Sequence, residues 1–359
     1  MNLRTLLKEM IERKASDLHI SAGAPPVFRI DGQIVRSSYD NVNPETCKQI
    51  AYSVLTENQQ KRFENEKELD FSFGIQGLSR FRANVFQQRG VVSLAIRKIP
   101  FEILDFDKLG LPEAVRTFSE KQKGLILVTG PTGSGKSTTL ASMIDKINNE
   151  RAAHVITIED PIEYIHKHKK CIVNQREVKA DTETFAQALK YVLRQDPDVI
   201  LIGEMRDRET MQAALTISET GHLAFATLHT NSTFESINRI VDTFPPGQQG
   251  QVRAQLAFVL KGVVTQQLIP HLSGTGRVLV AEVMVCTPAI SAIIRDDKIH
   301  QIYGLMQAGH KHGMQTMNQA LFAAVRNRQI SKNEALVRST DPAELTQMLG
   351  KKQVMSDRI

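Results

Sequence analysis

Residues 130–137 read G-P-T-G-S-G-K-S and follow directly on the apolar run G-L-I-L-V-T. The spacing G-x-x-x-x-G-K-[ST] between a strand and a helix is the phosphate-binding P-loop, whose glycines let backbone N–H groups curl around a phosphate at a helix N-terminus. In such a loop Lys136 reaches the β- and γ-phosphates and Ser137 holds Mg²⁺. The sequence therefore predicts a site for ATP and Mg²⁺. The expected nucleotide contacts are Pro131, Thr132, Gly133, Ser134, Gly135, Lys136, Ser137 and Thr138.

The chain after residue 121 repeats a strand, turn and helix pattern. Three further short apolar runs follow the P-loop, namely H-V-I-T-I-E-D, D-V-I-L-I-G-E and H-L-A-F-A-T-L-H. Strands that are apolar along their whole length are typical of a parallel sheet that is covered on both faces. Residues 116–359 are therefore predicted to form an α/β domain that binds its ligand at the carboxyl ends of the strands.

The first 99 residues alternate apolar and polar positions in the short period of antiparallel sheet. Asp31-Gly32 separates two apolar runs, which is a strong hairpin signal. Other strands are expected in L-D-F-S-F, S-R-F-R-A-N-V-F and V-S-L-A-I-R-K-I, with helices at 44–55 and 57–66. Residues 1–99 thus predict a small α+β domain. Residues 100–115 are expected to be a linker, because 100–112 carries two prolines and no clean period.

Length and composition agree with a folded chain of two domains. A chain of 359 residues exceeds the usual size of one domain. Its N-terminus mixes acids and bases along a helical pattern, unlike a signal peptide, and no apolar run reaches the length of a membrane span, so we expect a cytoplasmic protein. The three cysteines lie more than a hundred residues apart with no C-x-x-C pair, which argues against a disulfide framework and a cysteine zinc site.

The net charge of +6 raises nucleic-acid binding as an alternative. However, the charge is diffuse, since residues 1–115 carry 16 Lys+Arg against 15 Asp+Glu and residues 116–359 carry 29 against 24. No helix shows a continuous basic stripe, and the chain has no tryptophan and only five tyrosines to stack against bases. A nucleic acid is therefore not an expected partner.

Acidic residues at the ends of a predicted strand are candidates for the magnesium site. Asp198 and Glu204 lie at opposite ends of D-V-I-L-I-G-E, about 20 Å apart at strand rise, so only Glu204 is expected near the phosphates. Gly203 stands where many P-loop enzymes place a metal-binding aspartate. We therefore expect Glu204 to contact Mg²⁺ through water.

The stretch I-T-I-E-D-P-I-E-Y offers a general base. Its strand ends at Glu159 and Asp160, Pro161 breaks it, and Glu163 follows on the loop, where a carboxylate orients or deprotonates the attacking water. Glu163 is the favoured catalytic base, with Glu159 and Asp160 helping to position it. The alternative is an acidic strand end that is only solvated.

Two histidines bracket the last of the apolar runs. His222 and His229 are seven residues apart on one predicted strand, or about 23 Å, so one metal ion cannot bind both. His229 lies at the carboxyl end and is expected to sense the γ-phosphate. His222 lies at the far end and is either structural or at a subunit contact.

These motifs occur in the order G-P-T-G-S-G-K-S-T, I-E-D-P-I-E-Y, L-R-Q-D-P-D-V-I-L-I-G-E-M-R-D and T-G-H-L-A-F-A-T-L-H-T-N. In this order they resemble the Walker A, aspartate, Walker B and histidine boxes of the secretion ATPase superfamily, most closely its type IV pilus retraction branch. The resemblance covers S-D-L-H-I (16–20) to residues 288–298. It implies a RecA-like P-loop ATPase domain after a smaller PAS-like N-terminal domain. It also implies a cytoplasmic homo-hexamer on the inner-membrane platform protein at the base of a pilus.

The resemblance also implies roles for arginines in the N-terminal domain. Arg80, Arg82 and Arg97 lie on predicted strands among apolar residues, where an arginine needs an anionic partner or solvent. From the residues alone, exposure to solvent is the simpler interpretation. The superfamily implies instead that Arg82 and Arg97 are arginine fingers that contact the γ-phosphate and couple domain rotation to hydrolysis.

One stretch departs from the superfamily pattern. The signature Ala-Ile-Arg-Asn-Leu-Ile-Arg-Glu reads A-I-S-A-I-I-R-D here, with Ser291 and Ala292 at the Arg-Asn positions. The stretch predicts a short helix begun by Pro288, with an apolar stripe and Arg295 near its end. The stripe either only packs on the core or, as the resemblance implies, belongs to a helix that couples ring motion to retraction. The stripe consists of Ile290, Ile293 and Ile294.

The expected function is ATP hydrolysis that powers pilus retraction in twitching motility. Extension and type II secretion relatives typically have a longer N-terminal region and a four-cysteine zinc element. This sequence shows neither feature, which favours retraction. Two alternatives that involve an accessory retraction paralogue stay open. The chain is either such a paralogue itself or the principal motor with such a paralogue as its partner. From other classes, a small-molecule kinase, a nucleic-acid translocase and a non-catalytic assembly module stay open.

Overall fold

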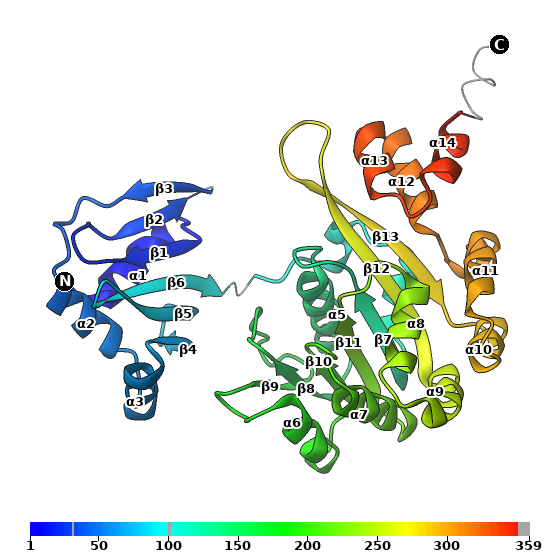
Figure 1. Ribbon diagram of the computed structural model, residues 1–359, viewed down its shortest axis with the longest axis horizontal. Helices are drawn as coiled ribbons and strands as arrows, with labels where there is room; N and C mark the ends of the chain where they lie inside the picture. The colour runs from blue at the N-terminus through cyan, green and yellow to red at the C-terminus, as the bar shows by residue number, and fades with distance from the viewer. Residues whose placement is uncertain (31, 100–101, 351–359) are drawn as a thin grey trace. The chain divides into compact units, whose positions relative to one another are not determined.

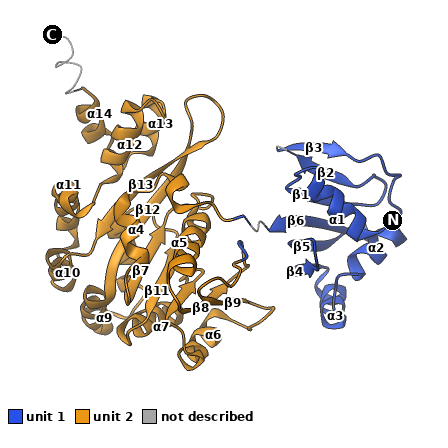
Figure 2. Ribbon diagram, turned by 180° about the vertical axis from the view of Figure 1, so that it is seen from behind, with its two compact units in different colours: residues 1–102, 163–165 blue, residues 103–162, 166–359 orange. Residues whose placement is uncertain are grey.

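The computed structural model describes residues 1–30, 32–99 and 102–350. The chain divides into two compact units, one of residues 1–102 and 163–165, the other of residues 103–162 and 166 onward (Figure 2). Each unit has its own buried apolar core. The chain therefore passes from one unit to the other three times.

The first unit contains a six-stranded antiparallel sheet in the order β3-β2-β1-β6-β5-β4 (Figure 1). The expected hairpin forms, because Ile30 pairs with Gln33 across the turn, although Asp31 itself lies outside the described residues. Helices α1 and α2 pack on β1 and β6. The elements are α1 (Leu3–Glu12), β1 (Asp17–Ile20), β2 (Val27–Ile30), β3 (Gln33–Arg36), α2 (Pro44–Tyr52), α3 (Glu57–Glu66), β4 (Glu68–Ile75), β5 (Ser79–Gln88) and β6 (Val91–Ile99).

The helix starts in this unit follow from local sequence. The Asn43 side chain accepts the N–H of Thr46 at the start of α2, and Thr56 and Gln59 form a reciprocal capping box at the start of α3. The α1 helix buries Leu3, Leu6, Leu7 and Met10, the spacing of one helical face. Capping and amphipathic periodicity are short-range signals, which explains why both helices expected from the sequence are present.

The second unit contains a seven-stranded sheet in the order β13-β12-β7-β11-β10-β8-β9. All neighbouring strands are parallel except β12 and β13, which form a long antiparallel pair. The strands are β7 (Gly124–Thr129), β8 (His154–Glu159), β9 (Ile172–Glu177), β10 (Val199–Ile202), β11 (Leu223–Leu228), β12 (Leu260–Pro270) and β13 (Arg277–Val285).

Helices cover both faces of this sheet (Figure 1). Leu125 and Leu127 of β7 belong to one core cluster, with residues of α6 to α10, whereas Ile126 and Val128 belong to the other, with residues of α4 and α5. Burial on both faces is what the apolar runs predicted. The helices are α4 (Glu113–Ser119), α5 (Lys136–Glu150), α6 (Phe185–Val192), α7 (Arg208–Glu219), α8 (Thr233–Asp242), α9 (Pro246–Val259), α10 (Pro288–Arg295), α11 (Ile302–Ala308), α12 (Met317–Arg326), α13 (Lys332–Arg338) and α14 (Pro342–Gly350).

The linker expected at residues 100–115 is too long. Residues Phe106–Leu109 form a short 3₁₀ helix, α4 begins at Glu113, and Phe106 and Val115 are buried in the core of the second unit. The two prolines interrupt the periodicity of this stretch, so the sequence pattern did not indicate these helices. Pro112 directly precedes the start of α4, a position where proline is tolerated.

Helices α12 to α14 form a smaller cluster with the outer ends of β12 and β13. Glu282 of β13 lies at the junction: its carboxylate accepts the N–H of Thr233, at the start of α8 (2.7 Å), and the N–H of Met317, at the start of α12 (3.3 Å). Burial raises the pKa of Glu282, and these hydrogen bonds partly offset that effect. One buried side chain thus holds the first turns of two helices.

Candidate nucleotide site

The P-loop lies between the end of β7 and the start of α5, as the spacing predicted. Gly135 is the N-cap of α5, and Lys136 is its first residue. The Lys136 ammonium is buried and donates to the carbonyls of Gly130 (2.8 Å) and Pro131 (3.1 Å). Residues 131–133 are exposed, so the loop presents its backbone to solvent in front of a helix N-terminus. This arrangement suits a phosphate group.

Strand β12 supports the loop from behind. The Gln266 side chain donates to the Ser134 carbonyl at 2.8 Å and is fully buried. Gly130 has φ 137°, and a Cβ atom there would lie 2.3 Å from the Gln266 carbonyl oxygen, so only glycine fits. The sequence motif did not indicate Gln266, because it lies 132 residues from Ser134 along the chain.

A row of hydroxyl groups connects the base of the P-loop to α8. Thr129, the last residue of β7, is 2.8 Å from the Thr265 hydroxyl of β12 and accepts from Ser236 of α8 at 3.5 Å. Ser236 is in turn 2.6 Å from the Thr230 hydroxyl, in the loop after β11. The P-loop and the histidine-bearing loop are therefore joined by side chains that no short motif contains.

Glu204 and His229 come together at the carboxyl ends of neighbouring strands. Glu204 Oε2 lies 2.7 Å from Arg206 Nη2, and Glu204 Oε1 lies 3.3 Å from His229 Nε2. Burial by itself would raise the pKa of Glu204, but Arg206 and His229 together hold it below its ordinary value. Glu204 is therefore an ionised acceptor at neutral pH, and Arg206 is a partner that the sequence analysis missed.

Gly203 is tightly enclosed at the end of β10. A Cβ atom there would lie 3.0 Å from the Ile158 carbonyl oxygen and 3.2 Å from Glu159 Cα, both on β8. An aspartate at this position would therefore push against the neighbouring strand. Close strand packing explains why the position that holds a metal ligand in many P-loop enzymes is glycine in this chain.

The acidic residues after β8 differ in their surroundings. The Glu159 carboxylate accepts from the Thr157 hydroxyl (2.6 Å) and from Gln175 of β9 (3.2 Å), whereas Asp160 is exposed before Pro161. Glu163 is also exposed, and residues 163–165 group with the first unit, not with the unit that contains the P-loop. The base role of Glu163 stays a prediction.

The oxygen groups expected to hold Mg²⁺ have the right chemistry. Ser137 is half-buried in the first turn of α5, and Glu204 supplies an ionised carboxylate at the end of β10. Mg²⁺ prefers oxygen ligands and usually takes only one or two from the protein, with phosphates and waters completing the shell. Within the described residues there is no cluster of three or more His, Cys, Asp or Glu that would form an all-protein metal cage.

His222 has a local structural contact at the opposite end of β11. Its Nδ1 lies 3.1 Å from the Thr220 hydroxyl and 3.2 Å from the Ile217 carbonyl, both at the end of α7. This contact favours the structural alternative for His222. The separation of His222 from His229 by the whole of β11 agrees with the expectation that they do not share a metal.

In the first unit, Arg82 and Arg97 are direct neighbours. Arg97 of β6 pairs with Arg82 on β5 on one side and with Asp17 on β1 on the other, so all three share one face of the sheet. Arg97 Nε donates to Asp17 Oδ1 at 2.8 Å while most of its side chain remains exposed. Burial would raise the pKa of Asp17, but Ser16 and Arg97 hold it below its ordinary value. Asp17 was not among the predicted site residues.

Comparisons with known proteins decide the family. The model of the family described as "Type II/IV secretion system protein" matches residues 2–337. This chain belongs to that family. The type IV pilus retraction ATPase PilT of Pseudomonas aeruginosa is 46% identical over 342 residues, which cover 95% of this chain and 99% of that protein. The type IV pilus ATPase PilU of the same organism is 41% identical and covers 97% of this chain and 91% of that protein.

The family also includes solved structures of similar fold. A crystal structure of the pilus retraction motor PilT with bound ADP has a TM-score of 0.91 and 52% identity, covering 97% of this chain and 99% of that one. This similarity confirms the predicted fold class, a RecA-like P-loop domain with a smaller N-terminal α+β domain. Over the residues that the structure describes, helices of the length and apolarity needed to cross a bilayer are absent.

Proposed function

We propose that this chain is a motor ATPase that hydrolyses ATP to power retraction of type IV pili. The P-loop carries the proposal, because its lysine is enclosed by the loop between a buried strand and a helix N-terminus. A fold alone does not imply a function. Here the P-loop occurs together with the aspartate, Walker B and histidine boxes in a chain 46% identical to a protein named a pilus retraction ATPase.

In the proposed reaction, Lys136 exchanges its two loop carbonyls for phosphate oxygens, which are stronger acceptors because they are charged. Mg²⁺, when bound, would supply positive charge to balance the charge on the phosphates. Ser137 would hold it, with Glu204 acting through water. The contact between His229 and Glu204 gives His229 a means to respond to the γ-phosphate.

Glu163 is the proposed general base. Glu159 is a weaker candidate because its carboxylate already accepts hydrogen bonds from Thr157 and Gln175. An acceptor that is already engaged has less capacity to hold and deprotonate a water molecule. The proposed part of Glu159 and Asp160 is to shape the start of the loop that carries Glu163.

Arg82 and Arg97 are the proposed arginine fingers. Their side chains lie on one face of the sheet of the first unit, and the pair is exposed. We propose that they close over ATP bound by a neighbouring subunit in a homo-hexamer. The same proposal places the ring in the cytoplasm, against the inner-membrane platform protein at the pilus base.

A second candidate is the accessory retraction motor. The 41% identity to PilU extends over 97% of this chain, so the same architecture serves both kinds of relative. In that case the partner of this chain is a second, principal retraction ATPase. Twitching that persists in cells lacking this gene, and fails only when another motor is also weakened, would favour the accessory candidate.

The experiment combines ATPase assays with cells that lack the gene. We expect hydrolysis without any nucleic acid, and cells with excess surface pili that no longer twitch. Wild-type protein should restore twitching, whereas Lys136→Ala should not, because it lacks the positive charge aimed at the β- and γ-phosphates. Hydrolysis that depends on DNA or RNA and falls steeply with salt would instead support a translocase.

A further inference from the structure

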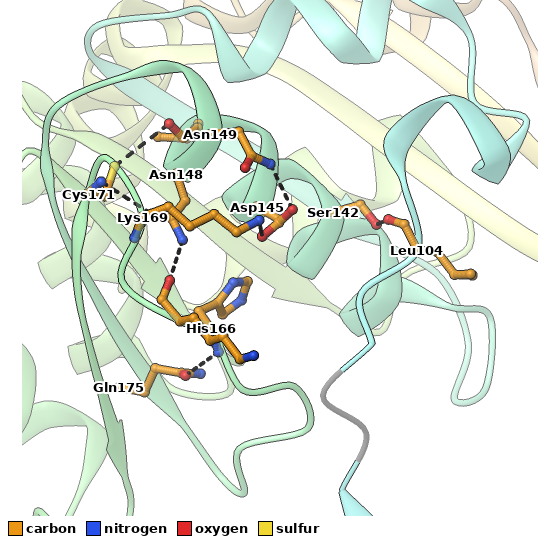
Figure 3. Close-up of polar contacts among 11 residues, drawn as sticks. Leu104, Ser142, Asp145, Asn148, Asn149, His166, Lys169, Cys171 and Gln175 are labelled. Carbon is orange, nitrogen blue, oxygen red and sulfur yellow. Dashed lines mark hydrogen bonds and ion pairs between the residues drawn. The ribbon is translucent and has the colours of Figure 1, made fainter.

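The P-loop helix α5 carries an asparagine that binds the backbone of a distant loop. The Asn148 side chain is fully buried; its Nδ2 donates to the Lys167 carbonyl at 2.7 Å, and its Oδ1 accepts the N–H groups of Lys169 and Cys171, each at 3.2 Å. The Asn148 carbonyl also accepts the N–H of Lys170 at 3.0 Å. Figure 3 shows Asn148 beside Lys169 and Cys171 in this loop of residues 166–171.

This loop directly follows the segment that carries Glu163. The chain leaves the second unit at Ile162 and returns to it at His166, and both residues are buried. The Ile162 N–H bonds to Glu177 at 3.3 Å and the His166 N–H to Gln175 at 2.8 Å, so β9 holds both ends of residues 163–165. Beyond His166, Asn148 holds the chain.

Another contact between α5 and the loop is also buried, but it is weak: the Cys171 thiol donates to the Ile147 carbonyl at 3.7 Å. A further contact lies at the surface. Lys169 Nζ lies 2.6 Å from Asp145 Oδ1, and both side chains are partly exposed, so this ion pair is weak compared with the buried amide contacts. The side chain of Asn149, the next residue, donates to Asp145 on its own helix at 2.9 Å. Asn148 is therefore the main buried connection between α5 and loop 166–171.

We propose that Asn148 is a positioning residue that fixes loop 166–171 to the P-loop helix and thereby sets the place of Glu163. The inference rests on the proposed function, in which Glu163 is the base. Lys136 and Asn148 begin and nearly end one continuous helix, about 18 Å apart along its axis. One helix thus carries both the phosphate-binding lysine and the anchor of the loop that follows Glu163.

The first test compares Asn148→Ala with Asn149→Ala. Asn148→Ala removes three hydrogen bonds to the loop, and displacement of a base by about 1 Å can cost about 100-fold in rate. We expect kcat to fall about 10- to 100-fold with KM changed less than about threefold, since ground-state binding of ATP is retained. Asn149→Ala, on the same turn but outside the loop contacts, should keep wild-type kcat. Unchanged kcat in folded Asn148→Ala would overturn the inference.

The second test is a double-mutant cycle with Glu163→Gln, measured by single-turnover hydrolysis. If Asn148 acts through Glu163, Asn148→Ala should cause little further loss in the Glu163→Gln background. An equal loss in both backgrounds, with Glu163→Gln itself impaired, would refute the inference alone and leave the proposed function standing. Normal turnover by Glu163→Gln would refute the proposed base instead.

If Asn148→Ala does not fold, the same kcat measurements can be made with Asn148→Asp. An aspartate retains acceptor oxygens for the two N–H groups, replaces the donor to the Lys167 carbonyl by an acceptor and, when ionised, adds a buried charge. We expect a kcat loss of about tenfold that again disappears in the Glu163→Gln background. Wild-type kcat in Asn148→Asp would count against the positioning role.

Discussion

The three candidate glutamates differ in the groups that already bind their carboxylates. Glu204 contacts Arg206 and His229, and the pKa of Glu204 lies below its ordinary value. Glu159 accepts two hydrogen bonds from side chains, whereas Glu163 is exposed. A carboxylate whose charge is stabilised in this way is a poor proton acceptor. This difference favours Glu163 as the base and a charge-balancing role for Glu204.

Glu163→Gln should separate binding from chemistry. The amide keeps the shape of the side chain but cannot take a proton, so ATP should still bind while kcat falls by roughly 10²–10⁴. Nucleotide affinity and steady-state turnover, measured on the same preparation, check this expectation. Normal turnover in Glu163→Gln, combined with such a loss in Glu204→Gln, would reverse the two roles.

His166 should make the second unit sensitive to acid. Burial lowers the pKa of His166 to about 4, although Asp145 opposes the shift, whereas an unfolded histidine titrates near 6.5. Between these pH values the unfolded chain binds the proton and the folded chain does not, so the free energy of unfolding falls as pH falls. The loss reaches up to about 3 kcal/mol below pH 4.

Denaturant unfolding at pH 7.5 and pH 5 tests this contribution. His166→Gln carries no titrating group there and should lose less stability between the two pH values than the wild type. The exposed His300 is a matched position, and His300→Gln should lose as much as the wild type. Equal acid sensitivity in His166→Gln and the wild type would show that His166 is protonated in the folded protein.

The residues that could be predicted are those whose chemistry is contained in a short motif. Lys136 and Ser137 follow from the P-loop spacing, and Glu204 follows from its place at the end of an apolar strand. Gln266 and Asn148 could not be predicted in this way, because each binds backbone groups far away in the sequence. Neither amide differs in type or neighbourhood from an ordinary polar residue on a strand or helix.

Among the elements, the strands buried on both faces were predictable and the edges of the sheet were not. β7, β8, β10 and β11 lie inside the sheet, and their sequences are mainly apolar, with polar residues chiefly at the ends of β8. β9 lies at the edge of the sheet and has a neighbouring strand on one side only. Its sequence, I-V-N-Q-R-E, contains polar residues and therefore lacks the continuous apolar run that indicates a buried strand. The antiparallel pair of β12 and β13 closes the opposite edge and was also not expected.

Helix α10 has the features that the sequence predicted. It starts at Pro288, Ile290 and Ile294 are fully buried, and Ile293 packs partly buried against the same core. Arg295 ends the helix with most of its side chain exposed, and its Nε lies 3.3 Å from Oδ1 of the adjacent Asp296. The isoleucines therefore account for packing, and Arg295 is available for another role.

Arg295→Ala should test whether α10 couples hydrolysis to movement. An exposed charge paired with its neighbour contributes little to stability, so the variant should fold, form rings and hydrolyse ATP normally. We expect cells with this variant to have excess surface pili and to stop twitching. Normal twitching at normal protein level would remove Arg295 from the mechanism and leave α10 as a packing element.

At the scale of the whole molecule, we propose that the arginine fingers act in an assembled ring. Asp17, Arg97 and Arg82 form a row across three strands of the first unit, and the P-loop belongs to the second unit. An arginine finger is useful only when it closes over a nucleotide held elsewhere, and its loss costs about 10³–10⁵ in rate.

Arg97→Ala should therefore purify as the same ring as the wild type and hydrolyse ATP poorly. Sedimentation at several concentrations reports the ring, and turnover reports the finger. Arg36→Ala, which removes an exposed arginine from the edge strand β3, is the matched control and should keep both properties. A protein that sediments as a monomer at every concentration, yet is fully active, would contradict the hexamer proposal.

The division of the chain into units has a consequence for how such proteins can be cut or recombined. Residues 163–165 group with the first unit but are encoded in the middle of the second. A gene fragment that ends near residue 102 therefore lacks residues 163–165 of the first unit. The remaining fragment contains these three residues but not the rest of the unit with which they group. Exchange of N-terminal domains between paralogues would have to bring a compatible Glu163–Ile165 segment with it, so the two parts are constrained to change together.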